Sequence, residues 1–201
     1  MIDLNKQKLN FKSHVATFSD YGNIKILDFK KPNSSEYRIR FLFEEDYYRL
    51  HISGDLGELI ATNFRNMTYE DFSDFVNDVG YFESKIDCHS RPIYVFDEDA
   101  AKEDLRELFK EDSLMVDTAA NKYLWESEDE QRIDDAICDI LVDFSETTGM
   151  GSKGIEELSE YILDPYEAHT TASRIGKRPT GILDLYMLAF KLAQENLKAS
   201  K

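Results

Sequence analysis

Hydrophobic residues in the first third of the chain alternate with polar ones, which is typical of strands with one buried face. In segment 37–41, Tyr, Ile and Phe alternate with two arginines, so one face packs inward and the other meets water. Turn-forming residues separate the segments that show this pattern. The segments cover 11–18, 23–29, 36–43, 47–53 and 59–61. The pattern predicts an antiparallel meander of about four to six strands.

Beyond residue 66 the hydrophobic spacing changes to the three- and four-residue steps of helices. The predicted helices cover 68–79, 98–110, 127–146, 155–162 and 182–198, with a short strand at 93–96. Strands followed by helices, without βαβ alternation, predict an α+β fold: an N-terminal antiparallel β-sheet (meander) with packed helices, followed by a helical C-terminal part. We divide it into an α+β domain at 1–120 and an acidic helical domain or extension at 121–201. One continuous fold is the alternative.

The chain is strongly acidic, and its acidity is unevenly placed. Its 201 residues hold 24 Lys and Arg against 40 Asp and Glu, a formal net charge of −16. Residues 1–53 carry +2, residues 54–165 carry −21 and residues 166–201 carry +3. Such a charge opposes direct binding of nucleic acid or anionic lipid and favours a neutral or basic protein as partner. The absence of a signal-peptide pattern and of a long apolar stretch predicts a cytoplasmic protein that does not enter the membrane.

The helix predicted at 127–146 contains the candidate partner-binding residues. They are Glu128, Asp134, Asp135, Asp139, Asp143 and Glu146. The aspartates at 135, 139 and 143 recur every four residues, which places them on one face of a helix, where like charges repel. A row of carboxylates can imitate the phosphates of a nucleic-acid strand and occupy the basic channel of a nuclease. A solvated face that aids solubility is the alternative.

Other residues with reactive side chains give weaker patterns. Glu83, Asp87, Cys88 and His89 are metal-binding types without the spacing of a metal motif, and they support an alternative in which the chain is a small enzyme or a metal-dependent accessory. Cys88 and Cys138 are predicted to be buried thiols, and the histidines to lie at the surface. No nucleotide-cradle or nucleophile motif is present, so the sequence predicts no catalytic residue and no cofactor.

Two further groups are candidates for contacts. Tyr47, Tyr48, Tyr69 and Tyr81 form a candidate contact patch, because Tyr is favoured at interfaces, with core packing as the alternative. The basic loop at 174–178 is expected to pair with the protein's own acidic surface or with a second copy of the chain.

Three segments carry a resemblance to a known group of proteins: 47–58 (YYRLHISGDLGE), 81–86 (YFESKI) and 94–97 (YVFD). Over about the first half of the chain they resemble uncharacterised proteins encoded by phages and prophages of Gram-positive bacteria. Small acidic phage proteins look like a source of inhibitors of bacterial defence, including anti-CRISPR proteins, which is an analogy of setting and charge.

The leading hypothesis combines this resemblance with the charge. It is a phage-encoded, non-enzymatic inhibitor that binds a basic nucleic-acid-binding protein, above all a CRISPR effector nuclease, through its acidic residues. A small phage enzyme of nucleic-acid metabolism is one alternative. An assembly module whose C-terminal helix packs as a homodimer is the other.

Overall fold

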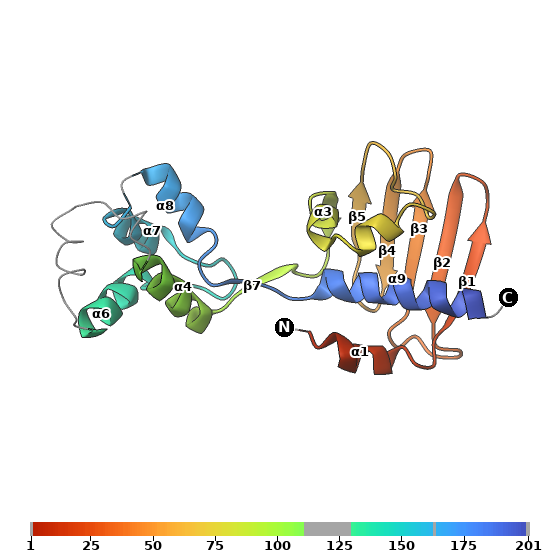
Figure 1. Ribbon diagram of the computed structural model, residues 1–201, viewed down its shortest axis with the longest axis horizontal. Helices are drawn as coiled ribbons and strands as arrows, with labels where there is room; N and C mark the ends of the chain where they lie inside the picture. The colour runs from red at the N-terminus through yellow and green to blue at the C-terminus, as the bar shows by residue number, and fades with distance from the viewer. Residues whose placement is uncertain (1, 111–129, 163, 200–201) are drawn as a thin grey trace. The chain divides into compact units, whose positions relative to one another are not determined.

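The chain has a mixed α+β fold, as the sequence predicts (Figure 1). The structure is a computed structural model, and it describes residues 2–110, 130–162 and 164–199. These residues form two compact units: unit 1 comprises Met1–Ile93 and Thr180–Lys201, and unit 2 comprises Tyr94–Pro179. The boundary predicted between 120 and 121 falls outside the described residues. The units instead separate at 93/94 and 179/180, because the C-terminal helix packs on the N-terminal sheet.

Unit 1 is built on a six-stranded antiparallel sheet in which every strand pairs with its neighbours in sequence. The strands are β1 Val15–Asp20, β2 Ile24–Lys30, β3 Ile39–Glu44, β4 Arg49–Gly54, β5 Leu59–Thr62 and β6 Ile86–His89. The register pairs Leu27 with Phe41 and Phe41 with Ile52, so apolar side chains of adjacent strands share one face. The five predicted strands are confirmed. Strand β6 was not placed from the sequence, because Asp87, Cys88 and His89 break the hydrophobic alternation.

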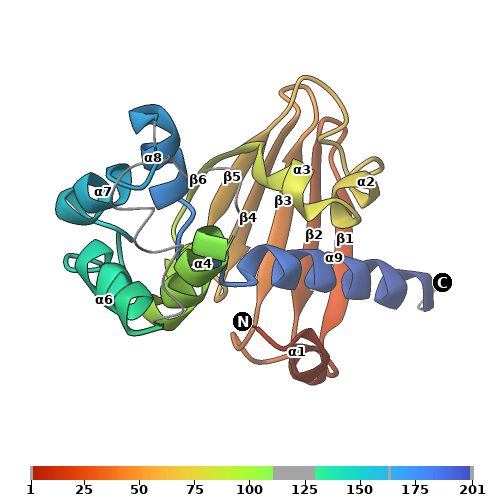
Figure 2. The ribbon, with the colours of Figure 1, turned by 60° about the vertical axis from the view of Figure 1, so that its left-hand side comes forward.

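Among the residues that the structure describes, unit 1 has four helices: α1 Leu4–Asn10, α2 Ser73–Val76, α3 Val79–Glu83 and α9 Ile182–Ala199. Helices α2, α3 and α9 lie on one face of the sheet, and α1 packs beside α9 (Figures 1 and 2). Phe190 of α9 is fully buried, with its ring centroid 5.2 Å from that of Phe41 and 4.8 Å from that of Phe72. The hydroxyl of Tyr186 donates to the carbonyl oxygen of Leu56 at 2.9 Å, and burial raises the pKa of Tyr186 to about 12. Helix α9 therefore completes the core of unit 1.

Unit 2 has its own hydrophobic core. Its elements are β7 Tyr94–Phe96, α4 Glu98–Lys110, α6 Glu130–Ile140, α7 Ser152–Ser159, α8 Pro165–Ala172 and β8 Lys177–Pro179. Strands β7 and β8 pair antiparallel, at the two points where the chain enters and leaves the unit. Among its most deeply buried side chains are Leu105, Ile137, Ile140 and Leu158, each at most 1% exposed.

The helices of the second half differ from the prediction in their bounds. The helix expected over 127–146 ends at Ile140, because residues 141–143 form a turn that directs Asp143 toward α7. Helix α8 begins at Pro165, directly after Asp164. The sequence pattern predicts only that the preceding helix ends at this proline. In the part of the chain that the structure describes, no helix combines the length and the apolar composition needed to cross a membrane.

Candidate functional site

The negative charge of the protein is concentrated in unit 2. Residues 94–179 hold 23 acidic and nine basic side chains, a net charge of −14. The remaining residues, which make up unit 1, hold 17 acidic and 15 basic side chains, a net charge of −2. The division into compact units thus coincides with a division of charge. Unit 2 is therefore the part of the chain that would attract a basic partner.

Two of the candidate carboxylates have roles in holding unit 2 together. Asp134 accepts a hydrogen bond from Nη2 of Arg106 at 2.6 Å, which joins α6 to α4. Asp143 lies beyond the end of α6 and accepts from the backbone N–H groups of Lys153 and Gly154, both at 3.0 Å. Partial burial acts to raise the pKa of Asp143, but the hydrogen bonds from these N–H groups outweigh it and the pKa is lowered. Asp143 therefore caps α7, and the expectation that it continues a row along one helix is wrong.

The other candidate residues on α6 are available to a partner. Asp135 and Asp139 are exposed and stand one helical turn apart, as predicted. Within the described residues Asp135 accepts only from Nε2 of Gln131, at 3.0 Å, and no cation pairs with Asp139. Glu146 is exposed in the loop after α6, and Glu128 lies outside the described residues. The predicted row is thus reduced to a pair on α6.

Helix α7 adds carboxylates that the sequence analysis did not single out. Tyr161 is half-buried, and its pKa is raised by burial and by the negative charges of Glu157, Asp139 and Glu160. The two helices pack against each other, so Asp139 of α6 lies near the acidic end of α7. We call Asp139, Glu157 and Glu160 the acidic cluster. Their separation in sequence hides this grouping, which only the α6–α7 packing creates.

No described cation neutralises the acidic cluster. The three carboxylates are exposed, and none has an ion-pair partner among the residues of known position. Elsewhere in unit 2, Lys102 lies 2.8 Å from Glu98, and Arg178 pairs with Asp104. Like charges that gather without a counter-ion destabilise the folded state, and a partner's Lys or Arg would relieve them.

The basic loop is occupied within the protein, as predicted. Arg178 donates two hydrogen bonds to the carboxylate of Asp104, and Lys177 places its Nζ 4.0 Å from the ring centroid of Tyr94. The guanidinium of Arg178 lowers the pKa of Asp104 and outweighs partial burial, which acts to raise it. These contacts anchor β8 to α4 and to β7. The third cation of the loop, Arg174, is exposed and has no ion pair among the described residues.

The metal-binding alternative gains no support from the described residues. Asp87, Cys88 and His89 follow one another on β6, so their side chains alternate between the two faces of the sheet. Asp87 accepts from Oγ1 of Thr62 at 3.3 Å, and Nδ1 of His89 contacts the carbonyl oxygen of Arg91 at 2.7 Å. Nowhere in ranges 2–110, 130–162 and 164–199 do three such side chains gather as ligands.

The predictions for cysteine and histidine are partly wrong. Cys88 and Cys138 are free and exposed, because β6 is an edge strand and Cys138 lies on the solvent side of α6. His14 is buried at 4% exposure among Phe11 and Phe29. The sequence holds no signal for this burial, because His14 precedes a strand and contacts residues from elsewhere in unit 1.

The tyrosines of the predicted contact patch divide into two classes. Tyr47, Tyr48 and Tyr81 are exposed. Tyr69 is half-buried and stacks on Phe18 with a centroid distance of 4.3 Å, so it belongs to the core of unit 1.

Comparison with known proteins gives no match: no family model, no curated protein and no solved structure matches this chain.

Proposed function

We propose that the chain is a non-enzymatic binding protein whose unit 2 occupies a basic, nucleic-acid-binding surface of another protein. The observation that supports this most directly is the division of charge: −14 on unit 2 against −2 on unit 1. An acidic surface that served solubility alone would be spread over both units. Together with the resemblance to phage proteins, this favours an inhibitor of a host defence nuclease, with a CRISPR effector nuclease as the target to test.

The contact surface in this proposal comprises Asp135 and the acidic cluster. Their carboxylates project from α6 and α7 and have no cation from their own chain among the described residues. Lys and Arg that line a nucleic-acid channel form charge-assisted hydrogen bonds with carboxylates as they do with phosphates. The complex would form quickly at low salt and weaken as ionic strength rises.

The test compares two charge reversals in the same unit. Asp135→Lys with Asp139→Lys changes the candidate surface, and Glu103→Lys with Glu107→Lys changes an exposed pair on α4 with the same four-residue spacing. We expect the first variant to lose inhibition of guide-loaded CRISPR effector nucleases and the second to retain it. Equal inhibition by both variants and the wild-type chain would contradict the proposal.

A competition experiment separates imitation of nucleic acid from binding elsewhere on the nuclease. If unit 2 occupies the DNA channel, target DNA and the protein exclude each other, so the apparent inhibition constant rises with DNA concentration. Binding that is independent of DNA would place the contact on another surface. The first step is a pull-down with purified nucleases at low and then moderate salt, where salt-sensitive release is expected.

A further inference from the structure

One end of the unit 1 sheet exposes five aromatic side chains: Tyr21, Tyr47, Tyr48, Phe64 and Tyr81. Phe64 is 96% exposed. Because β1, β3 and β5 run in the same direction, the β1–β2 turn, the β3–β4 turn and the segment after β5 all lie at this end (Figure 1). We call these five residues the aromatic end. Large apolar side chains gathered at the surface of a folded protein mark a contact site.

Backbone and side-chain hydrogen bonds join the loops that carry these side chains. The N–H of Glu45 donates to the carbonyl of Asn23 at 2.8 Å, which links the β3–β4 turn to the β1–β2 turn. The N–H of Asn63 donates to the carbonyl of Tyr48 at 3.1 Å, and its side-chain amide lies 3.4 Å from the hydroxyl of Tyr81. The segments that carry the aromatic end are therefore joined to one another rather than being separate loop tips.

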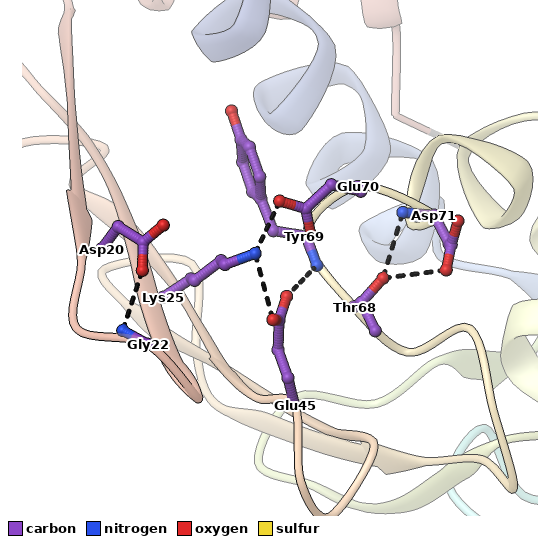
Figure 3. A network of polar contacts seen from close by, with 8 residues as sticks. All are labelled: Asp20, Gly22, Lys25, Glu45, Thr68, Tyr69, Glu70 and Asp71. Atoms are coloured by element: carbon purple, nitrogen blue, oxygen red, sulfur yellow. Dashed lines mark hydrogen bonds and ion pairs between the residues drawn. The ribbon is translucent and has the colours of Figure 1, made fainter.

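A polar network joins residues beside the β1–β2 turn, in the β3–β4 turn and in the segment before α2 (Figure 3). Nζ of Lys25 lies 3.0 Å from Oε2 of Glu45 and 2.6 Å from Oε1 of Glu70. The second oxygen of Glu45 accepts from the N–H of Tyr69 at 3.1 Å. The side chains of Lys25 and Glu45 are only 12% and 18% exposed, so solvent competes little for the bond between them, whereas Glu70 is 60% exposed. Loops that are already ordered lose less conformational entropy when a partner binds.

Tyr48 is held in a backbone conformation that tyrosine rarely adopts. Its φ is 46°, in the left-handed region that favours Gly and Asn. An aromatic residue there is strained, and strained residues gather at functional sites. A glycine would fit this turn without strain, so Tyr48→Gly removes the ring without adding backbone strain.

The charges around the aromatic end indicate the kind of partner. Residues 20–25, 44–49 and 63–71 hold six carboxylates and three cations, an excess of three negative charges. Lys25 pairs with Glu45 and Glu70, and Arg49 pairs with Glu44. Asp20, Asp46 and Asp71 have no ion pair among the described residues. This excess disfavours nucleic acid and anionic lipid, whose phosphates would be repelled. The rings already accept cations: Arg49 lies 5.6 Å from the ring centroid of Tyr47, and Nζ of Lys85 lies 4.6 Å from that of Tyr81.

We propose that the aromatic end is a second interaction surface, which binds an arginine- and lysine-rich surface of another protein. Tyrosine faces bordered by carboxylates offer both contacts that a guanidinium group uses, stacking and charge-assisted hydrogen bonding. Tyrosine is also the residue that loop-based protein-binding sites use most. The proposal uses residues of unit 1 alone and does not depend on the proposed function of unit 2.

The test is a titration of the full, isotope-labelled chain with an oligo-arginine peptide at low ionic strength, followed residue by residue by NMR. We expect saturable shifts at Tyr21, Tyr47 and Tyr48, whatever happens to the resonances of 94–179. The double variant Tyr47→Ser, Phe64→Ser should weaken the affinity read at these loops about tenfold. It should leave the shifts of 94–179 unchanged. Shifts confined to 94–179, or loop affinities that the variant does not alter, would overturn the proposal.

Two further measurements distinguish binding by the rings from unfolding and from binding of nucleic acid. Tyr48→Gly removes the ring and the strain together, so we expect a thermal midpoint at or above that of the wild-type chain and a weaker loop affinity. A loss of binding in that variant cannot come from unfolding, and an unchanged affinity would count against the proposal. An oligothymidine titration that shifts the same loop resonances more tightly than the peptide would assign the surface to single-stranded nucleic acid instead.

Discussion

Asp104 on α4 and Arg178 on β8 are joined by two parallel hydrogen bonds, from Nη2 to Oδ1 at 2.6 Å and from Nη1 to Oδ2 at 2.9 Å. The N–H of Gly176 donates to the same carboxylate at 2.8 Å. The pair thus fixes the last strand of unit 2 to its first helix. The two residues are 74 positions apart in the chain, so loss of the pair would loosen the point at which unit 2 closes.

We expect Asp104→Asn to lower the free energy of unfolding of unit 2 by about 1–2 kcal/mol, because Arg178 keeps its charge and loses its carboxylate in a partly exposed setting. Urea unfolding measures the change. Glu98→Gln is the control, because Glu98 pairs with Lys102 at the surface and its loss should alter stability little. A smaller effect of Asp104→Asn than of Glu98→Gln would contradict the importance of this pair.

The stability of unit 1 should fall as the pH drops below about 6.5, because of His14. Nε2 of His14 donates to the carbonyl of Tyr37 at 3.2 Å, so Nδ1 carries the lone pair, and it has no hydrogen-bond partner among the described residues. Burial, which outweighs the hydrogen bond to Tyr37, lowers the pKa of His14 below its ordinary 6.5. The unfolded chain therefore takes up a proton at a pH where the folded chain does not, and acid favours unfolding.

Thermal unfolding between pH 7.5 and 5 tests this. We expect the wild-type midpoint to fall with pH more steeply than that of His14→Gln, which has no imidazole to protonate. His169→Gln is the control, since His169 is exposed and should leave the slope unchanged. Identical slopes in all three proteins would show that His14 does not control the acid response.

Asp139 and Asp143 are equivalent in the sequence pattern and differ in the structure. Asp143→Ala removes the side chain that accepts from the N–H groups of Lys153 and Gly154, so it should lower the urea midpoint of unit 2. Asp139→Ala removes one charge from the acidic cluster and should leave that midpoint unchanged or raise it. Circular dichroism at increasing urea distinguishes the two. Equal destabilisation by both substitutions would contradict the assigned roles.

Tyr186→Phe should lower the free energy of unfolding of unit 1 by about 0.5–1.5 kcal/mol, since the carbonyl of Leu56 loses its donor. Tyr166→Phe is the matched control, because Tyr166 is 78% exposed and removing its hydroxyl should have no effect. The comparison holds the chemistry of the change constant and varies the burial and the hydrogen bonding of the hydroxyl group. If the two substitutions have the same effect, the bond to Leu56 adds nothing to stability.

The sequence pattern predicts local structure well and packing poorly. Strands β1 to β5 and helix α4 follow their hydrophobic periods, and α4 occupies 98–110, as predicted. The predicted row of three aspartates along one helix is not found in the structure. Hydrophobic periodicity indicates a helix but does not define the residue at which it ends. Asp143 accepts a hydrogen bond from a backbone N–H group at the start of α7 instead of extending α6. The donor, Lys153, lies ten positions further along the chain.

The acidic cluster and the aromatic end were beyond sequence analysis for the same reason. Asp139, Glu157 and Glu160 act together on Tyr161 because α6 packs on α7. Phe64 is brought close to Tyr48 by the pairing of β4 with β5. Tyr47, Tyr48 and Tyr81 could be named as contact residues from their type. Which tyrosines face solvent depends on the loops, and Tyr69 turns inward onto Phe18.

The place of α9 in the chain has a consequence for the order in which the protein is made. Helix α9 supplies Tyr186 and Phe190 to the core beneath the sheet, yet all of unit 2 is translated before it. Unit 2 is continuous in sequence and can fold as soon as it leaves the ribosome, whereas the apolar face of the sheet waits for the C-terminal residues. The N–H of Thr180 donates to the carbonyl of Ile93 at 2.8 Å, so the returning chain meets the point it left. Unit 1, which begins before unit 2 in the chain, is therefore completed after it.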